Sequence, residues 1–253
     1  MSYNIRYAST HDANNRWEFR KEGLAALLNS YYPDILVTQE VLKEQKDDLN
    51  FLLTGYASIG VGKDDGMEKG EFEVIFYKKE RFEKTESGFF WLSTSPSQPG
   101  SIGWDAASVR MVSWCRLKDT YKGNMLYVFN THFDDRGEVA RKESAILLRH
   151  FADSIAATQP VIICGDLNST DNSNVYDEMI KKTDQGTFRD AGYGKSAGTY
   201  AAGFGAKRKF SNRIDYIFYS TSLAQKSYLV ISDHKGKNFP SDHKPVMAEF
   251  LFP

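Results

Sequence analysis

The sequence predicts one mixed α/β (α+β) domain, with residues 1–253 forming a single unit. Short apolar runs typical of strands alternate with segments of helical periodicity, and some consecutive strands are joined without a helix between them. No linker, repeat or low-complexity tract interrupts the chain. A length of 253 residues is ordinary for one large α/β domain. These observations favour one domain over two smaller ones.

The composition indicates a globular protein, with 41% hydrophobic and 26% charged residues. Lys and Arg (32) nearly balance Asp and Glu (33), so the formal net charge is −1. Dedicated nucleic-acid-binding proteins usually carry a clear basic excess, so this balance counts mildly against a large polyanionic substrate. The cysteines, Cys115 and Cys164, lie in apolar stretches, which favours buried thiols over a disulfide scaffold or a zinc site.

Neither the compartment nor the oligomeric state follows from the sequence. No apolar run reaches the length of a membrane helix, and no signal peptide is visible. The chain begins directly in an expected strand at Tyr3, so a leader could have been trimmed. A soluble protein, either cytoplasmic or exported, is therefore expected.

The first part of the chain is expected to alternate strand and helix. A strand over 3–7 leads into a polar loop, and apolar residues at helical spacing then predict a helix over 16–30 that ends before Pro33. The apolar run 35–37 predicts a strand that ends in polar groups. Residues 43–53 again have helical spacing.

The middle of the chain is expected to contain more strands and a long loop. A strand is predicted over 74–77. Residues 88–114 have the Pro, Ser and Gly content of a long ordered loop, and such loops in compact domains often carry function. Strands follow over 111–117 and 126–130, and a long amphipathic helix over 139–157.

The last part of the chain repeats the pattern. A buried strand over 161–164 enters the turn Gly165-Asp166-Leu167-Asn168, where glycine permits a sharp bend. Short apolar or amphipathic runs predict the remaining elements, which are a helix over 174–182 and strands over 213–219, 227–231 and 246–252.

Polar side chains capable of chemistry lie in these strands or directly after them. They are Asn4, Glu40, His132, Asp166, Asn168, Asp215, Asp242 and His243. Because ligands gather at strand ends in open α/β sheets, we expect these groups to converge. Carboxylate and amide oxygens suit Mg²⁺ or Mn²⁺, whereas the zinc motif His-Glu-x-x-His is missing. The histidines and an aspartate remain for proton transfer and for charge on a phosphate.

Each residue also has a purely structural alternative. Glu40 could be a solvated strand end, and Asp166 and Asn168 could be turn formers. Asp215 lies in an apolar strand, where a carboxylate needs a partner, and that partner could be a structural arginine. His132 could be a core histidine whose hydrogen bonds are satisfied, and His243 could cap a Ser-Asp-His turn. The order and context of all the residues together decide between these alternatives.

In their order, these motifs resemble the endonuclease/exonuclease/phosphatase superfamily, which includes pancreatic-type deoxyribonucleases, AP endonucleases, inositol-polyphosphate 5-phosphatases, neutral sphingomyelinases and deadenylases. The motifs are Asn4, Gln39-Glu40, Thr131-His132, Gly165-Asp166-Leu167-Asn168, Arg213-Ile214-Asp215-Tyr216 and Ser241-Asp242-His243. The resemblance covers nearly the whole chain. It implies a four-layer sandwich of two packed mixed β-sheets flanked by helices.

The resemblance also implies a metal site and a catalytic water. Glu40, helped by Asn4 and Asp242, looks like the ligand set for Mg²⁺, with Mn²⁺ as a possible substitute. Asp166 looks like the residue that orients or deprotonates the attacking water, and Asn168 like the residue that holds a phosphate oxygen.

The remaining roles fall to the histidines. His243 would act as general base or bind the phosphoryl group, with Asp215 fixing its tautomer, and His132 would stabilise charge on the phosphoryl oxygens. AP endonucleases carry a Tyr in place of His132, so the chain resembles the deoxyribonuclease and phosphatase branches more closely. Asp134 and Arg141 are expected to form a supporting pair.

A second Ser-Asp-His sequence occurs at 232–234, but only the copy at 241–243 is followed by Pro and a buried terminal strand, as the superfamily pattern requires. The copy at 232–234 is therefore not expected to be catalytic.

Substrate contacts are expected from the long loop, which resembles that of a bacterial subgroup. Arg110 is a candidate phosphate clamp, although it could instead pair with Asp105 or Asp134. Trp104 could stack on a base or a sugar ring, or pack in the core. The dense basic cluster Lys207-Arg208-Lys209 could contact further phosphates or be a solvated loop.

The expected function is therefore hydrolysis of a phosphate mono- or diester on a small or modest-sized substrate. Nucleic acid is a possible substrate but not a required one. A nuclease acting on single-stranded DNA or RNA is the alternative. A catalytically inactive binding relative fits less well, because Glu40, Asp166, Asp242 and His243 are all present.

Overall fold

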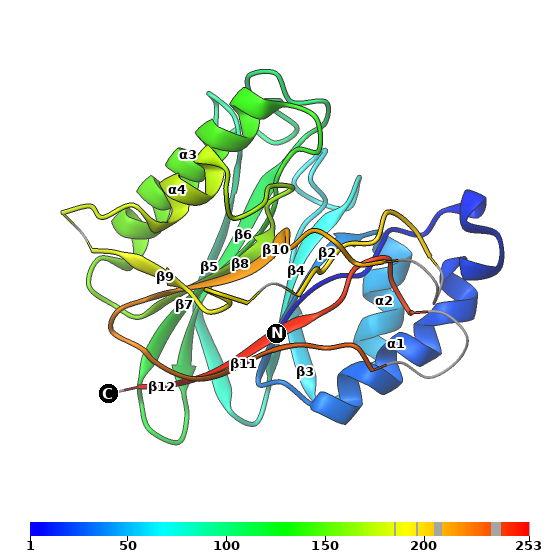
Figure 1. Ribbon diagram of the computed structural model, residues 1–253. Helices are drawn as coiled ribbons and strands as arrows, with labels where there is room; N and C mark the ends of the chain where they lie inside the picture. The colour runs from blue at the N-terminus through cyan, green and yellow to red at the C-terminus, as the bar shows by residue number, and fades with distance from the viewer. Residues whose placement is uncertain (185, 196, 205–208, 234–238, 253) are drawn as a thin grey trace.

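The computed structural model describes residues 1–184, 186–195, 197–204, 209–233 and 239–252. Two six-stranded β-sheets pack face to face, and helices cover their outer faces (Figure 1). This arrangement is the four-layer sandwich expected from the sequence. Within the described ranges, no helix combines the length and hydrophobicity that a membrane span requires.

The first sheet has the strand order β11-β12-β1-β2-β4-β3, and only β1 and β2 of its neighbouring strands run parallel. Its strands are β1 (Ser2–Asn4), β2 (Ile35–Val41), β3 (Tyr56–Ile59), β4 (Phe72–Lys78), β11 (Ala224–Val230) and β12 (Val246–Leu251). Helices α1 (Trp17–Tyr31) and α2 (Lys43–Leu52) bury their apolar sides against its outer face.

The second sheet has the strand order β5-β6-β7-β8-β10-β9, with β7 and β8 as its parallel pair. Its strands are β5 (Phe82–Trp91), β6 (Met111–Asp119), β7 (Met125–His132), β8 (Val161–Asp166), β9 (Phe188–Asp190) and β10 (Asp215–Ser220). Helices α3 (Glu138–Ala156) and α4 (Asn174–Ile180) cover its outer face (Figure 1).

The face between the two sheets changes from apolar to polar along the strands. In its apolar part, Val37 and Ile75 of the first sheet pack with Val128, Cys164 and Ile217 of the second. Strand side chains alternate between faces, so the residues two positions beyond Val37, Val128 and Cys164 also point between the sheets, as do those two positions before Ile75 and Ile217. They are Gln39, Asn130, Asp166, Glu73 and Asp215. Those positions are polar, and the sandwich therefore has a polar end.

Asn130 joins the two sheets at the start of this polar end. Its side-chain amide donates to the carbonyl oxygens of Thr38 and Val74 at 2.9 and 3.0 Å, and its Oδ1 accepts from Gln39 Nε2 at 2.6 Å. Asn130 is fully buried, so water cannot replace these bonds. One side chain of β7 is thus fixed to β2 and to β4.

Most predicted elements are present within a few residues of their expected bounds, but the long loop is shorter than predicted. Residues 82–91 form β5, which sequence analysis missed because Glu83 to Glu86 are exposed and conceal the apolar alternation. Such charged positions are common on edge strands. The loop is therefore confined to residues 92–110. Strands β3 and β9 were also missed, since each has four residues or fewer.

Replacement of Asn130 by Ala should lower the free energy of unfolding by about 2–4 kcal/mol, because it strips hydrogen-bond partners from buried groups of Gln39, Thr38 and Val74. Denaturant titration measures this loss. Asn50→Ala is the matched control, since Asn50 is exposed and accepts one bond from Ser58. Equal free energies of unfolding for the two variants would show that the Asn130 hydrogen bonds between the sheets contribute nothing specific to stability.

Candidate active site

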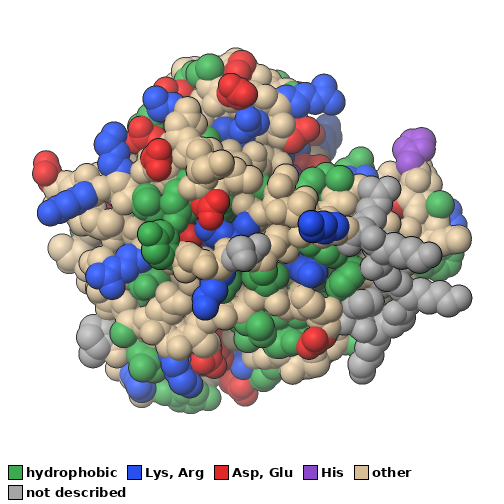
Figure 2. All heavy atoms as spheres, viewed as in Figure 1, with side chains coloured by type: hydrophobic (Ala, Val, Ile, Leu, Met, Phe, Trp, Pro, Cys, Tyr) green, Lys and Arg blue, Asp and Glu red, His purple; other side chains and the backbone are tan. Residues whose placement is uncertain are grey.

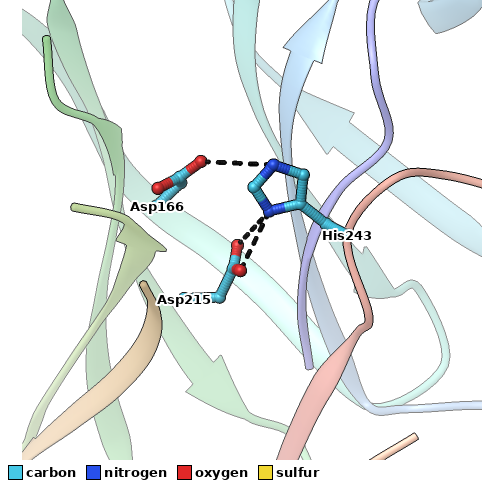
Figure 3. Close-up of side chains that lie close together, drawn as sticks. All are labelled: Asp166, Asp215 and His243. Atoms are coloured by element: carbon cyan, nitrogen blue, oxygen red, sulfur yellow. Dashed lines mark hydrogen bonds and ion pairs between the residues drawn. The ribbon is translucent and has the colours of Figure 1, made fainter. Parts of the chain in front are cut away.

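A row of three functional side chains crosses the second sheet at its polar end. His132 of β7 lies opposite Asp166 of β8, which lies opposite Asp215 of β10. Directly paired residues share a face, so all three point toward the first sheet. His243 enters from the segment before β12 and completes the group (Figure 3).

His243 is held between the two carboxylates of this row. Its Nδ1 donates to Asp215 at 2.9 and 3.2 Å, and its Nε2 lies 3.7 Å from Asp166 Oδ2 (Figure 3). Burial opposes charge on His243, but Asp215, Asp166 and Asp242 outweigh it and raise its pKa to about 10. Burial and the neighbouring Asp215 raise the pKa of Asp166 to about 7, although His243 opposes the shift. The raised pKa of His243 reflects the negative charge around it, whereas that of Asp166 reflects burial first and the charge of Asp215 second.

The first sheet contributes Glu40, which Asn4 connects to this group. Asn4 Nδ2 donates to Glu40 Oε1 at 2.9 Å and to Asp166 Oδ2 at 3.1 Å, while the backbone N–H of Arg6 donates to Asn4 Oδ1. Glu40 has a φ of 59°, in the left-handed region that L-residues rarely adopt. Such backbone strain concentrates at functional sites. Asn4 therefore sets the separation of two carboxylates from different sheets.

Asp242 reaches the site through a fixed turn. Ser241 Oγ donates to the carbonyl of Asn4 at 2.7 Å and accepts from the backbone N–H of His243 at 3.2 Å. Asp242 itself is buried and helps to raise the pKa values of His243 and Tyr200. The polar end thus gathers carboxylates from β2, β8 and the segment before β12.

This donor set fits a hard divalent cation. Glu40, Asp166 and Asp242 offer carboxylate oxygens, which Mg²⁺ and Mn²⁺ prefer. Asp166, Asp215 and His243 also offer ligand atoms within 4.8 Å of one another. Asp215 and His243 already satisfy each other, however, so that trio is better suited to handling a proton than to holding a metal.

His132 and Asn168 form a second pair. Asn168 Nδ2 donates to His132 Nε2 at 3.0 Å and to the carbonyl of Phe133 at 2.9 Å. His132 is therefore neutral, with its proton assigned to Nδ1. Burial, together with the positive charges of Arg110 and Lys63, holds the pKa of His132 well below its usual value.

Gly165 allows the second sheet to place Asp166 and Asn168 together. A Cβ on Gly165 would lie 2.0 Å from the carbonyl oxygen of Thr131, so a larger residue would separate β7 from β8. The backbone N–H of Asn168 then donates to Asp166 Oδ1 at 2.9 Å. The predicted bend at Gly165 thus allows β7 and β8 to pair closely and orients the Asp166 carboxylate.

Asp134 fixes the loop that follows His132. Its carboxylate accepts from the backbone N–H groups of Ala107, Ser108, Arg136 and Gly137 at 2.8–3.2 Å. It also lies 3.4 Å from Nε of Arg110. The long loop and the start of α3 are therefore attached to the residue two positions after His132.

Arg110 is buried and bonded to two carboxylates, Asp134 and Asp135, the latter at 3.0 Å. This arrangement matches the structural alternative weighed for Arg110, pairing with Asp134. Arg141 contacts Asp134 as expected, but its Nη1 donates to the backbone carbonyl at 3.1 Å rather than to the carboxylate. A carboxylate that already accepts four backbone N–H groups leaves little room for a second guanidinium.

Other residues singled out from the sequence lie away from the central row. Trp104 is 37% exposed on the loop 92–110 and has a φ of 50°. In the second Ser-Asp-His sequence, Asp233 accepts from the hydroxyl of Tyr31, and His234 lies outside the described residues. Lys209 is described, whereas its neighbours at 207 and 208 in the basic cluster are not.

Sequence analysis missed two residues beside the site. Glu73 of β4 is buried, its Oε2 has no partner among the described residues, and burial raises its pKa well above the usual value. A lone Glu in the apolar strand Phe72–Lys78 is the signal that could have revealed it. Tyr200 packs its ring against His243, with centroids 4.8 Å apart, and no sequence pattern marks it.

Comparisons with known proteins agree with this geometry. Residues 1–243 match the model of the Endonuclease/Exonuclease/phosphatase family. A solved structure described as a Bacteroides thetaiotaomicron mannosyl-6-phosphatase is 35% identical, with a TM-score of 0.92. The match covers 99% of this chain and 98% of that one.

The match spans less than two thirds of the length of two curated relatives. The uncharacterized protein L388 of Acanthamoeba polyphaga mimivirus is 27% identical over 171 residues, which are 65% of this chain and 63% of L388. The 3'-5'-exoribonuclease subunit Ccr4 of Saccharomyces cerevisiae is 24% identical over 93% of this chain, but the match covers only 35% of Ccr4.

Asp134→Asn should destabilise the protein by about 1–2 kcal/mol at pH 7 and less in acid. Burial opposes ionisation of Asp134, but its backbone N–H donors and Arg110 lower its pKa from 3.8 to about 2. Because the pKa of Asp134 is lower in the folded protein than in the unfolded one, the ionised carboxylate stabilises the fold at pH values above 3.8. This stability disappears as the pH falls from 3.8 toward 2. Urea titrations at several pH values measure the difference, with exposed Asp177→Asn as control. A pH-independent difference would contradict the role of charge.

Proposed function

The chain belongs to the endonuclease/exonuclease/phosphatase family, whose members hydrolyse phosphoester bonds, and from this premise we propose that it is a Mg²⁺-dependent phosphoesterase acting on a small phosphate ester. One observation carries the proposal. Asn4 joins Glu40 of the first sheet to Asp166 of the second, within reach of the His243–Asp215 pair. A structural protein has no need of so many buried carboxylates.

Glu40 and Asp242 would hold the metal ion, with Asn4 keeping the Glu40 carboxylate in place. The donors are oxygens, as Mg²⁺ requires, and Mn²⁺ could replace it. When bound, the ion supplies neutralisation and polarisation of the phosphoryl oxygens. The backbone N–H of Tyr7 bonds the other Glu40 oxygen at 3.2 Å, so the carboxylate is held from both sides.

Asp166 is placed to take the proton of the attacking water. Its Oδ1 is held by the backbone N–H of Asn168, whereas its Oδ2 faces Asn4, His132 and His243. A water oxygen bonded to Oδ2 would attack phosphorus as the bond to the leaving oxygen breaks, and its proton would pass to the carboxylate.

His243 would stabilise the phosphoryl group, while His132 and Asn168, which are bonded to each other, would border the reacting position. His243, oriented by Asp215, presents Nε2 toward the site, where it can donate to a phosphoryl oxygen. The Asn168 amide contacts His132 and lies beside Asp166, so both side chains border the same reacting position. Preorganised donors of this kind are a major source of rate acceleration.

A small phosphomonoester, such as a sugar phosphate, is the favoured substrate. The net charge is −1, and on the face shown in Figure 2 Lys and Arg side chains are interspersed with Asp and Glu. A long polyanion would favour a continuous basic surface. The likeness to a mannosyl-6-phosphatase at 35% identity over nearly the whole chain also supports a monoester.

A nuclease acting on single-stranded RNA or DNA is the second candidate, and the likeness to Ccr4 supports it. An inactive binding relative fits less well, because the expected catalytic side chains are all present and mutually bonded.

The deciding experiment measures hydrolysis of p-nitrophenyl phosphate, a monoester, and bis(p-nitrophenyl) phosphate, a diester, with Mg²⁺ and with EDTA. Monoester turnover that EDTA abolishes supports the phosphatase, and mannose 6-phosphate is then the next substrate. Diester turnover alone would favour the nuclease and lead to oligonucleotides. EDTA-resistant turnover of either would contradict a metal mechanism.

Glu40→Gln should raise the Mg²⁺ concentration needed for half-maximal activity by about tenfold or more, because it removes one charged ligand oxygen. Metal titration of the steady-state rate measures the effect. Exposed Glu44→Gln on α2 is the matched control and should follow the wild type. If Glu40→Gln and Glu44→Gln gave the same titration curve, Glu40 would not be a ligand.

Asp166→Asn should lower kcat by about 10³-fold or more, since an amide cannot accept the proton of the water. The thermal unfolding transition should persist, because Asn can keep the bond from the Asn168 backbone N–H. Exposed Asp177→Asn serves as control. Full turnover by Asp166→Asn would exclude Asp166 as the base.

A further inference from the structure

The loop between β3 and β4 places Lys63 at the polar end of the sandwich. Gly62 pairs with Phe72 at the start of β4, and the backbone N–H of Lys63 donates to the carbonyl of Glu71. Trp91 of the second sheet donates from Nε1 to the carbonyl of Lys63 at 2.6 Å. Lys63 is therefore tied to both sheets.

Strand register places this contact near His132. Trp91 lies opposite Met111 on β6, and the next residue of β6, Val112, lies opposite Thr131 on β7. The row that contains Trp91 and Met111 therefore continues to His132. Two strand spacings, about 10 Å, separate the backbones of Trp91 and His132.

The side chain of Lys63 is held in place. It is 12% exposed, and its Nζ lies 2.5 Å from Glu71 Oε2. Glu71 directly precedes β4, and Glu73 lies two positions further along the chain. The ammonium has three N–H donors, and the bond to Glu71 uses one of them. The other two can bind an incoming anion.

The other positive groups near His132 are already engaged. Arg110 is bonded to Asp134 and Asp135, and His243 is paired with Asp215. His132 accepts from Asn168 and is neutral. After burial, the charges of Arg110 and Lys63 contribute to the lowered pKa of His132, in keeping with the placement that the strand register gives Lys63. Arg110 also keeps unused N–H donors, but two carboxylates compensate its charge, whereas Lys63 is bonded to one carboxylate, that of Glu71.

We propose that Lys63, positioned by Glu71 and Trp91, binds a terminal phosphate oxygen and selects phosphomonoesters over diesters. The inference rests on the proposed phosphoesterase function and deepens it. A monoester near pH 7 carries between one and two negative charges, because its second pKa is about 6, whereas a diester carries one. A fixed ammonium beside His132 stabilises the more highly charged substrate more strongly.

The first test compares kcat/KM for p-nitrophenyl phosphate and bis(p-nitrophenyl) phosphate at saturating Mg²⁺. Lys63→Met should lower the monoester value by about 30-fold or more and the diester value by less than about threefold. Lys63→Arg should restore most of the monoester activity. Exposed Lys69→Met on the same loop is the control. Equal losses on both substrates, or the same loss in Lys69→Met, would overturn the proposal.

The second test does not depend on turnover. Calorimetry with inorganic phosphate and Mg²⁺ should show about tenfold weaker binding to Lys63→Met than to the wild type or to Lys69→Met. If the wild type cleaves neither ester, the proposed function fails, yet a loss of phosphate binding in Lys63→Met still supports the phosphate site. If the wild type cleaves the monoester and Lys63→Met binds phosphate unchanged, the inference fails and the function stands. Thermal unfolding of each variant confirms that it is folded.

Discussion

The buried hydrogen bonds of Asn130 are the constraint on which the polar end of the sandwich depends. They fix β7 to β2 and β4 between the sheets, where water cannot compete. Glu40 follows Gln39 on β2, and His132 lies two residues beyond Asn130 on β7. The distance between the carboxylate of one sheet and the imidazole of the other is thus set by backbone pairing and one amide. Catalysis requires placement of this accuracy.

Electrostatics oppose this arrangement, and the opposition explains much of the surrounding structure. Carboxylates from both sheets meet in a buried space, which raises the pKa of Asp166 and favours a protonated His243. Asn4 lessens the repulsion by donating one N–H to each of Glu40 and Asp166. A site with this charge distribution stabilises the fold poorly, but it is well suited to a divalent cation and a phosphate.

The sequence allowed the fold class and the central residues to be predicted because both depend on local order. Apolar runs marked the inner strands, and Asp166, Asp215 and His243 stood in recognisable motifs. Contacts between distant segments could not be foreseen. Lys63 lies in a charged stretch that resembles any solvated loop, and only its bond from Trp91 shows its position. The pairing of Arg110 was likewise open until Asp134 and Asp135 were located.

The origin of each group explains how one scaffold can serve several substrates. Asp166, His132 and Asp215 lie on adjacent paired strands, where a change of position would disturb the sheet. Lys63 lies on a loop, which tolerates substitution more readily. In the proposed function, bond cleavage would therefore depend on the rigid part of the fold, and preference for a monoester on a loop side chain that can change without disturbing the paired strands. Substrate class in such a protein has to be inferred from its loops.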